Sequence, residues 1–579
     1  MPAKMVGMTQ RDLQKEMDRD GACIIPKLDQ WARKLGDKPC LYYGEDDSTL
    51  SYADFGALTD QIAGNLALQG VKKGDFVSVF MGNAKITILS MFAIWKAGAV
   101  YCPINFGFRG DFLAYQINDT QPKLLITERA MVPRLNDIAS ELSSVEGIVI
   151  YDPPQGAHDF CANPIDLDST LNGLPWEALL AATQRPDIEI RFDDVANVLY
   201  TSGTTGPSKG VVQTHRWMNQ YTFMCRSMMA QDDILYNDLP LYHVGGAIFN
   251  VVRAIWMGCT VVAWDRFSTT DFWPRIRKTG ASAASLIDTM IPWLLKANPT
   301  PDDRNNSLNK VHMQPLPNSH IEMAQRFGLD FISVGFGQTE TGMSFFSIVD
   351  ETEDGLTTSP DLRRGHSWKE MHDMAARLDI PFVKARDAST KGYMGIPSIF
   401  VEAAAFDEEG MMCAPGEIGE LALRPKLPAM FFREYLRKPD ATVKAFKNLW
   451  FHTGDTVRVD DTDAYTFMDR KGDRIRVRGE NVSSFEVEDF AGRFSGVMAS
   501  AAFAVPADIG EEDDIALCVE IKPGMAVSED ELRAWLAARM PKFMCPRYIR
   551  IVDAIPRTAT QKIEKYKLKK MLLSELGKQ

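Results

Sequence analysis

The chain has 579 residues and a mass of 64.8 kDa, enough for several domains or for one large body with an appendage. Its 45% hydrophobic and 24% charged residues are ordinary globular values, which exclude wholesale disorder. Acidic residues outnumber basic ones by 77 to 64, and the resulting charge of −13 argues against a nucleic-acid coat or a polybasic membrane binder. A small anionic ligand is not excluded, because backbone N–H groups and one lysine can form a local phosphate-binding site.

The start of the chain shows no export signal, and no apolar run is long enough to span a membrane. The best candidate, Ile86–Trp95, is short and bracketed by lysines, so we expect a buried helix there. The nine cysteines are scattered, without zinc-ligand spacing. They predict reduced thiols in a cytoplasmic protein with no zinc site and no disulfide framework.

In chain order, the first half alternates strand and helix patterns. Phe76–Phe80 predicts a buried strand, Ile86–Ala97 a helix, and Leu124–Thr127 and Gly147–Tyr151 further strands. This rhythm is typical of an α/β layered body.

The last stretch differs in charge. Residues 470–579 carry 19 basic against 17 acidic side chains, whereas the rest of the chain has a net charge of −15. Residues 528–531 have the spacing of a capping box, and an amphipathic helix pattern follows. We expect a large domain over 1–469 and a small α+β domain over 470–579.

A glycine-rich loop over 200–210 (YTSGTTGPSKG) follows the predicted strand Val195–Tyr200. Its glycines allow close backbone turns, its hydroxyls are donors, and Lys209 adds a point charge, which together suit a polyphosphate. It is not a Walker A loop, because Lys209 is followed by Gly210 and an apolar pair. The alternative is an ordinary surface loop. The candidate phosphate-binding positions are Thr201, Ser202, Gly203, Thr204, Thr205, Gly206 and Lys209.

This loop resembles the signature of the adenylate-forming superfamily, which includes acyl-CoA synthetases, peptide-synthetase adenylation domains and firefly luciferase. Segments similar to its other motifs follow in the family's order, and they are Leu239–Gly246, Gly335–Gly342, Phe451–Asp455, Asp469–Glu488 and Pro556–Ile563. The resemblance covers about residues 45–570, and the hinge pattern is most similar to crotonobetaine/carnitine-CoA-ligase-like acyl-CoA synthetases. It implies a large multi-subdomain α/β body with a smaller, mobile α+β C-terminal domain.

The resemblance also implies two half-reactions. A carboxylate attacks the α-phosphate of Mg-ATP to give an acyl-adenylate and pyrophosphate, and a thiol then displaces AMP. Such an attack on a polyanion needs positive charge where negative charge develops. Lys562 would reach the α-phosphate and the carboxylate, Thr339 would contact the α-phosphate, and Glu340 with Thr204 would hold Mg²⁺. The other implied nucleotide or cofactor positions are Phe336 against adenine, Gly337, Asp455 and Arg470 on the ribose, and Gly479.

Each assignment has a structural alternative. Asp455 could be a turn residue, Phe336 a core residue and His243 a satisfied core histidine, although we assign His243 to gating or to the acyl pocket. Lys562 lies near a lysine-rich run that predicts a solvated helix over 565–570.

Four departures from the family's pattern stand out. Gly472 occupies the hinge position, where the family has Asp or Lys, and Gln561 precedes Lys562 in place of Gly. Residues 313–317 replace the usual adenine-side loop. Residues 343–390 form a longer stretch than usual, which predicts a surface insertion, with a lid or an oligomer contact as the alternatives.

The acyl pocket is expected around 243–249, 287–293 and 333–335, where small, apolar and aromatic residues predominate and Asp288 adds a charge. We therefore expect a small aliphatic or aromatic carboxylic acid. The resemblance to acyl-CoA synthetases implies free CoA as the acceptor. A carrier protein as acceptor and a degenerate, non-catalytic nucleotide-binding relative are the alternatives. The sequence leaves open whether the protein is a homodimer.

Overall fold

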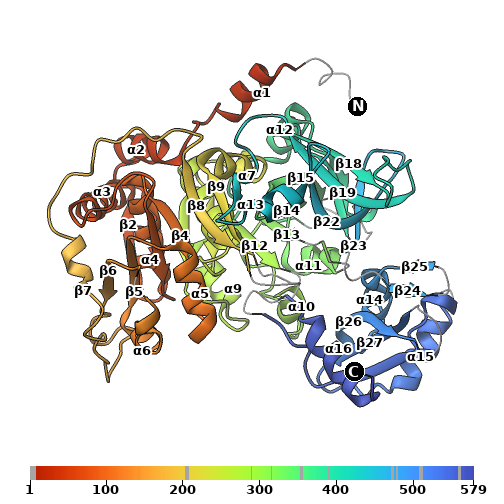
Figure 1. The fold of residues 1–579 in the computed structure, drawn as a ribbon. Coiled ribbons are helices and arrows are strands. Elements are labelled where there is room, and N and C mark those ends of the chain that lie inside the picture. Colours follow the sequence, from red (N-terminus) through yellow and green to blue (C-terminus); the bar gives the residue numbers. More distant parts are fainter. Residues whose placement is uncertain are drawn as a thin grey trace.

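The computed structural model describes residues 8–142, 144–201, 208–287, 290–314, 316–317, 319–352, 357–388, 392–470, 475–477, 480–507, 513–540, 542–558 and 562–578. It shows a large body and a smaller domain that contains the C-terminus (Figure 1). The predicted α/β class is confirmed. Within the described ranges, no helix is both long and apolar enough to cross a membrane.

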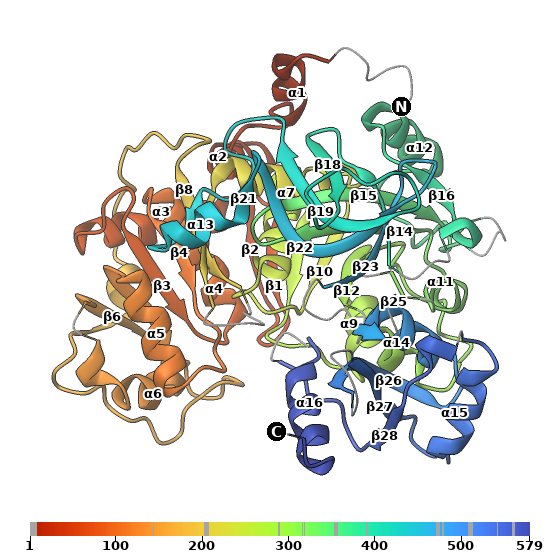
Figure 2. The same ribbon diagram turned by 45° about the vertical axis from the view of Figure 1, so that its right-hand side comes forward.

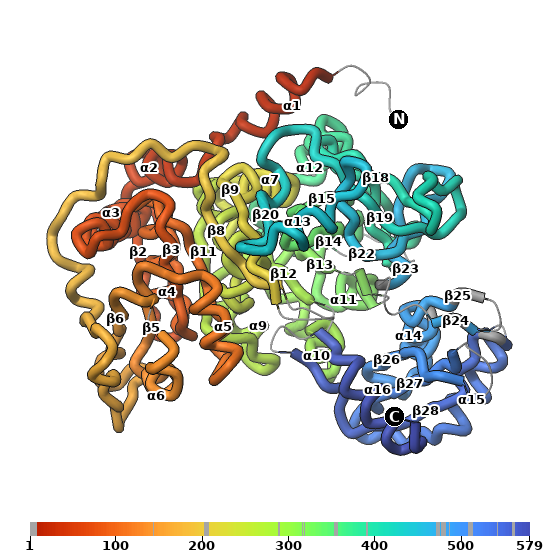
Figure 3. Tube along the Cα trace, in the orientation of Figure 1, coloured from red at the N-terminus to blue at the C-terminus, as the bar shows by residue number. Residues whose placement is uncertain are grey.

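The first sheet of the body has the strand order β20-β9-β8-β4-β3-β5-β6-β7. Its centre is parallel, and β9 and β20 join antiparallel at one edge, so β20 lies beside strands from far earlier in the chain (Figure 3). The predicted strands of the first half are all present, with ends within one residue. The bounds are β3 (Phe76–Phe80), β4 (Val100–Pro103), β5 (Leu124–Glu128), β6 (Gly147–Tyr151), β7 (Gly173–Pro175), β8 (Val195–Tyr200), β9 (Gly210–Thr214) and β20 (Glu434–Tyr435).

The second sheet has a parallel half, β1-β11-β10-β12-β13-β14, with β2 antiparallel at its outer edge and a largely antiparallel half that starts at β15. The turn from β14 to β15 lies where the two halves meet. The bounds are β1 (Pro39–Tyr43), β2 (Ser48–Ser51), β10 (Ile234–Asn237), β11 (Thr260–Ala263), β12 (Ala283–Ile287), β13 (Lys310–Gln314), β14 (Phe331–Gln338), β15 (Gly342–Asp350), β16 (Phe382–Lys384), β17 (Tyr393–Pro397), β18 (Val401–Phe406), β19 (Ile418–Pro425), β21 (Phe446–Lys447), β22 (Trp450–Val459) and β23 (Tyr465–Arg470).

Two helices of the body are almost wholly buried. In α4 every residue from Ile86 to Lys96 is buried, so the predicted buried helix is confirmed. In α7 all thirteen residues are buried, and the Thr214 side chain caps its first turn by accepting from the Trp217 N–H. The body's helices are α1 (Gln10–Met17), α2 (Ile24–Leu35), α3 (Tyr52–Leu68), α4 (Ala84–Lys96), α5 (Gly110–Thr120), α6 (Val132–Asn136), α7 (His215–Ser227), the π-helix η4 (Gly245–Val252), α8 (Arg253–Met257), α9 (Phe272–Thr279), α10 (Met290–Leu295), α11 (His320–Phe327), α12 (Trp368–Leu378) and α13 (Pro439–Ala445).

The small domain (blue in Figure 2) has its own hydrophobic clusters and a three-stranded sheet in the order β26-β27-β28. The Ser528 capping box is confirmed, because its side chain and that of Glu531 exchange hydrogen bonds with each other's backbone N–H. Strand β23 ends at Arg470, beside the domain boundary that we predict. The domain's elements are β24 (Ile475–Val477), β25 (Glu480–Val482), α14 (Ser484–Gly492), β26 (Val497–Pro506), β27 (Asp513–Ile521), α15 (Glu529–Ala537), β28 (Tyr548–Val552) and α16 (Lys565–Glu575).

The stretch 343–390 is more than a surface insertion. It begins inside β15, a fully buried strand that pairs with β14 and β17. Farther along, β16 pairs with β15 in parallel, and α12 lies near α1 at the top of Figure 1. Arg377 of α12 forms an ion pair with Glu16 of α1, which fixes this helix to the body. The lid and the oligomer contact stay predictions.

Candidate active site

The glycine-rich loop connects two antiparallel strands, β8 and β9. At its neck the Thr201 N–H donates to the carbonyl of Lys209 over 3.1 Å. Since a strand follows the lysine, the loop does not open a helix, which agrees with the rejection of a Walker A motif. Ser202, Gly203, Thr204, Thr205 and Gly206 lie outside the described residues, so their predicted phosphate contacts stay predictions.

Tyr435, which the sequence analysis did not single out, contacts both Lys209 and Glu340. The Nζ of Lys209 lies 4.1 Å from the ring centroid of Tyr435, and the Tyr435 hydroxyl donates to Glu340 Oε1 over 2.8 Å. Burial and the neighbouring Glu340 raise the pKa of Tyr435, so its proton stays on the hydroxyl. Tyr435 reaches this place because β20 pairs with β9, which brings Tyr435 opposite Val211.

Replacing Tyr435 with phenylalanine tests this link. The ring beneath Lys209 is retained, but Glu340 loses a hydrogen bond in a largely buried place, which costs about 1–2 kcal/mol. We expect kcat/KM for ATP to fall about 5–30-fold in steady-state kinetics, with a higher Mg²⁺ requirement. Unchanged ATP and Mg²⁺ dependence would show that the hydroxyl does not orient Glu340.

The turn between β14 and β15 carries Thr339 and Glu340 and is fixed by its backbone. The Gln213 side-chain amide donates to the Thr339 carbonyl over 2.7 Å, and the Phe432 N–H donates to the Glu340 carbonyl over 2.7 Å. A Cβ on Gly337 would lie 2.4 Å from the Gly342 carbonyl oxygen, so glycine is required where the strands approach. The turn therefore presents Glu340 in one position.

Asp455 lies fully buried in β22 and not in a turn, so the turn interpretation of the Thr-Gly-Asp motif is wrong. Its Oδ2 accepts a 2.6 Å hydrogen bond from the amide of Gln338, which the sequence analysis had not singled out. Arg470 on β23 pairs with Asp455 on β22, so the backbones of the two residues predicted to bind the ribose lie side by side. Phe336 is 9% exposed and packs edge to face against Phe345, as a core residue does, and its adenine contact stays a prediction.

His243 precedes the π-helix η4, a type of helix often found at functional sites. Its Nδ1 accepts from the Gly245 N–H over 3.2 Å, which places the proton of the neutral ring on Nε2. Burial, together with the nearby charge of Lys562, lowers the pKa of His243 to about 4. Close packing sets the start of η4, because a Cβ on Gly246 would lie 2.5 Å from two carbonyl oxygens.

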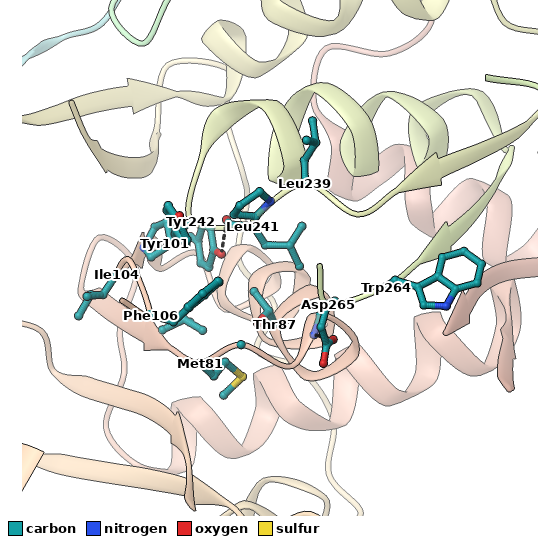
Figure 4. Close-up of a pocket in the computed structure, with 15 residues that line it drawn as sticks. Met81, Thr87, Tyr101, Ile104, Phe106, Leu239, Leu241, Tyr242, Trp264 and Asp265 are labelled. Carbon is teal, nitrogen blue, oxygen red and sulfur yellow. Dashed lines mark hydrogen bonds between the residues drawn. The ribbon is translucent and has the colours of Figure 1, made fainter. Parts of the chain in front are cut away.

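The segment before His243 rests on the first sheet, as Figure 4 shows. The Tyr101 hydroxyl donates to the Leu241 carbonyl over 3.1 Å, and Tyr242 meets Phe106 edge to face at 5.2 Å. The cavity drawn there measures about 10 Å³, which suffices for about one water molecule and not for a substrate. It is a packing feature that supports the His243 segment.

Lys562 is exposed and stands on a small hairpin of the C-terminal domain. Its N–H donates to Thr558 Oγ1 over 3.1 Å, and its carbonyl accepts from the Thr558 N–H over 2.8 Å. Its charge contributes to the lowered pKa of His243, so Lys562 lies within electrostatic range of the body, and its contact with the α-phosphate stays a prediction. The predicted helix after it is present, but Lys565 is not simply solvated, since it pairs with Glu488 over 2.8 Å. Gly472, Gly479 and Gln561 lie outside the described residues.

Of the residues predicted to bind Mg²⁺, the structure describes one, Glu340. Glu340 is 8% exposed, and Oε1 accepts from Tyr435, which leaves Oε2 for a hard cation. Among the residues that the structure describes, no group of three or more His, Cys, Asp or Glu side chains could hold a metal ion. The donor set thus suits an ion held mainly by phosphate oxygens and one carboxylate.

Buried neutral histidines predict acid-sensitive stability. Burial lowers the pKa of His215 to about 4 and that of His312 to about 3, whereas unfolded histidine titrates near about 6.5. Their contribution to the free energy of unfolding is therefore fully present above about pH 6.5. It is lost as the pH falls towards the pKa values of the folded state. We expect roughly 1–2 kcal/mol per histidine to be lost by about pH 5, measured as urea midpoints, and a smaller loss in His215→Gln. An identical pH slope in that variant would contradict the assignment.

The family model described as AMP-binding enzyme matches residues 28–436, and the model of its C-terminal domain matches residues 486–562. A crotonobetaine/carnitine–CoA ligase of Salmonella arizonae is 27% identical over 90% of this chain and 93% of its own. The solved structure of ATP-bound MatB from Rhodopseudomonas palustris has a TM-score of 0.74 at 21% identity, covering 93% of this chain and 98% of its own. MenE of Bacillus subtilis, an o-succinylbenzoate–CoA synthetase, has a TM-score of 0.72 at 21% identity, covering 94% and 97%. The chain belongs to the AMP-binding enzyme family.

Proposed function

We propose that the protein is an ATP-dependent, AMP-forming acid–CoA ligase. The observation that carries the proposal is that Tyr435 contacts both Lys209 and Glu340, next to the hydrogen bond from Gln338 to Asp455. The small domain adds Lys562, whose charge contributes, after burial, to the lowered pKa of His243. Charges of both signs from two domains suit a reaction in which a carboxylate meets a polyphosphate.

In the first half-reaction a carboxylate oxygen bonds to the α-phosphorus of ATP, and the bond to the bridging oxygen of pyrophosphate breaks. Lys209 with its loop holds the leaving pyrophosphate, and Lys562 offsets the charge that develops on the α-phosphate and the carboxylate. Glu340 would hold Mg²⁺, which would supply positive charge beside the phosphate oxygens. Asp455 accepts from the ribose hydroxyls and, like Arg470, fixes the nucleotide. His243 stays neutral and closes the acyl side of the site.

In the second half-reaction a thiolate attacks the acyl carbon, and AMP leaves with the oxygen that came from the acid. We propose CoA as the thiol, since the relatives' names describe CoA ligases. A small-domain rotation would first withdraw Lys562. The nine free cysteines suit a reducing compartment, so we propose action in the cytoplasm.

A panel of aliphatic, aromatic and dicarboxylic acids, each with Mg-ATP and CoA, tests the proposal by AMP release and thioester mass. We expect AMP and acyl-CoA in equal amounts with at least one acid. If AMP is released only when a carrier protein is present, the acceptor is a carrier thiol and not free CoA. ATP binding without AMP from any acid would support a non-catalytic nucleotide-binding protein and contradict the proposal.

A further inference from the structure

A row of polar side chains crosses three parallel strands beneath η4. Ser285 on β12, His312 on β13 and Ser333 on β14 are register partners, and His312 Nδ1 lies 3.0 Å from Ser333 Oγ. The neighbouring residues on these strands point to the opposite face, where Leu286 and Met313 join a separate hydrophobic cluster. The polar row therefore faces α7, η4 and α8, in the region where an apolar acyl pocket is expected.

The row ends at Arg253, the first residue of α8, which is only 3% exposed. Its guanidinium contacts Asn250 Oδ1 at 3.3 Å and Ser285 Oγ at 3.2 Å, and it lies 4.4 Å from the ring centroid of Phe249. These partners are neutral. Burial raises the pKa of the neighbouring Cys225 to about 11, so that thiol carries no charge either.

Arg253 differs from the other two buried arginines of the described chain because each of those lies close to a carboxylate. Arg216 lies 3.4 Å from Asp18, and Arg226 lies 4.0 Å from Asp20. Arg253 forms no ion pair with any described carboxylate, and it hydrogen-bonds to the neutral Asn250 and Ser285. A guanidinium does not lose its proton, so Arg253 is a buried positive charge for which the described residues provide no counter-charge.

Polar side chains continue from this charge towards the edge of the sheet where the active site is expected. Gln314, the partly exposed last residue of β13, lies 3.2 Å from His312 Nε2, so the polar row continues to the carboxyl edge of the strands. Ligands of open α/β sheets bind at that edge. On the helical side, η4 runs from beside His243 to Arg253. The ten residue steps from His243 to Arg253 would span roughly 15 Å at the rise of an α-helix, before the inward reach of both side chains is subtracted.

We propose that the acid substrate carries a second anionic group at the end remote from the reacting carboxylate, and that this group pairs with Arg253. The inference rests on the proposed function and names its substrate class: a dicarboxylic acid, or an acid with an equivalent anionic end. A charge-assisted pair with a guanidinium in a buried site is strong and bidentate. The same charge disfavours a betaine, whose remote end is cationic.

The test compares acids matched in length: a series of dicarboxylic acids, their half-amides and a betaine. We expect a dicarboxylic acid to exceed its half-amide about 10–100-fold in kcat/KM, measured by AMP release with Mg-ATP and CoA. Arg253→Gln should lower kcat/KM for the diacid about 10–100-fold more than for the half-amide, and Arg253→Lys should restore part of the preference. Preference for half-amides or betaines, or equal losses for both acids, would overturn the inference.

Equilibrium titration separates this inference from the proposed function. The diacid is titrated into the full chain with a non-hydrolysable ATP analogue, in the wild type and in Arg253→Gln. Binding that is at least tenfold weaker in the variant supports the pairing, even if no acid is turned over. Equal binding of diacid and half-amide by the wild type contradicts the pairing, whatever the catalytic result.

Discussion

Replacing Lys562 with alanine is expected to stop acyl-adenylate formation while largely sparing the thioester step. In the proposed mechanism Lys562 is the group that the small domain supplies to the site. Removing one preorganised group that stabilises developing charge costs about 10²–10³-fold in rate. We expect ATP–pyrophosphate exchange to fall by that factor, whereas acyl-CoA formation from supplied acyl-adenylate stays within a few-fold.

Lys570→Ala is the matched control, since Lys570 is also an exposed lysine of the small domain but lies on α16. It should leave both half-reactions near wild type. Equal loss of both half-reactions in the Lys562 variant would contradict a mechanism in which the small domain adopts two poses. An unaffected exchange reaction would remove Lys562 from the site.

Replacing Glu340 with glutamine is expected to raise the Mg²⁺ requirement sharply. Glutamine keeps an oxygen that can accept from the Tyr435 hydroxyl, so the substitution removes mainly the charge. A hard cation loses its anionic protein ligand. We expect the Mg²⁺ concentration for half-maximal exchange to rise about tenfold or more, and the maximal rate to fall about 10²-fold.

Glu434→Gln provides the control for Glu340, because Glu434 is the exposed neighbour of Tyr435 on β20. Its Mg²⁺ dependence should match the wild type. The metal assignment fails if Glu340→Gln keeps the wild-type Mg²⁺ dependence and loses activity only through protein stability, which melting curves would reveal.

Local patterns in the sequence predicted much of the fold. The strands Phe76–Phe80 and Gly147–Tyr151 were predicted with their observed ends, because buried β-strand runs between turn residues leave few alternatives. The start of α4 was placed two residues late, since Asn83 caps the helix ahead of the apolar run. The capping box at Ser528 likewise marks its helix through short-range hydrogen bonds.

What the sequence did not indicate depends on long-range pairing. Tyr435 acts on Glu340 only because β20 pairs with β9, and Gln338 reaches Asp455 only because distant strands share one site. The sequence analysis did not single out Arg253. Its neutral partners, Asn250 and Ser285, come from η4 and from β12, which only the folded structure brings together.

The fate of the acid's oxygen tests adenylate formation most directly. A carboxylic acid labelled with ¹⁸O in both carboxyl oxygens is incubated with Mg-ATP, CoA and the enzyme, and the products are analysed by mass spectrometry. The account predicts one ¹⁸O atom in each AMP released and none in pyrophosphate, because the attacking oxygen stays on the α-phosphorus when the thiol displaces AMP. Unlabelled AMP, or label in inorganic phosphate together with ADP, would contradict it.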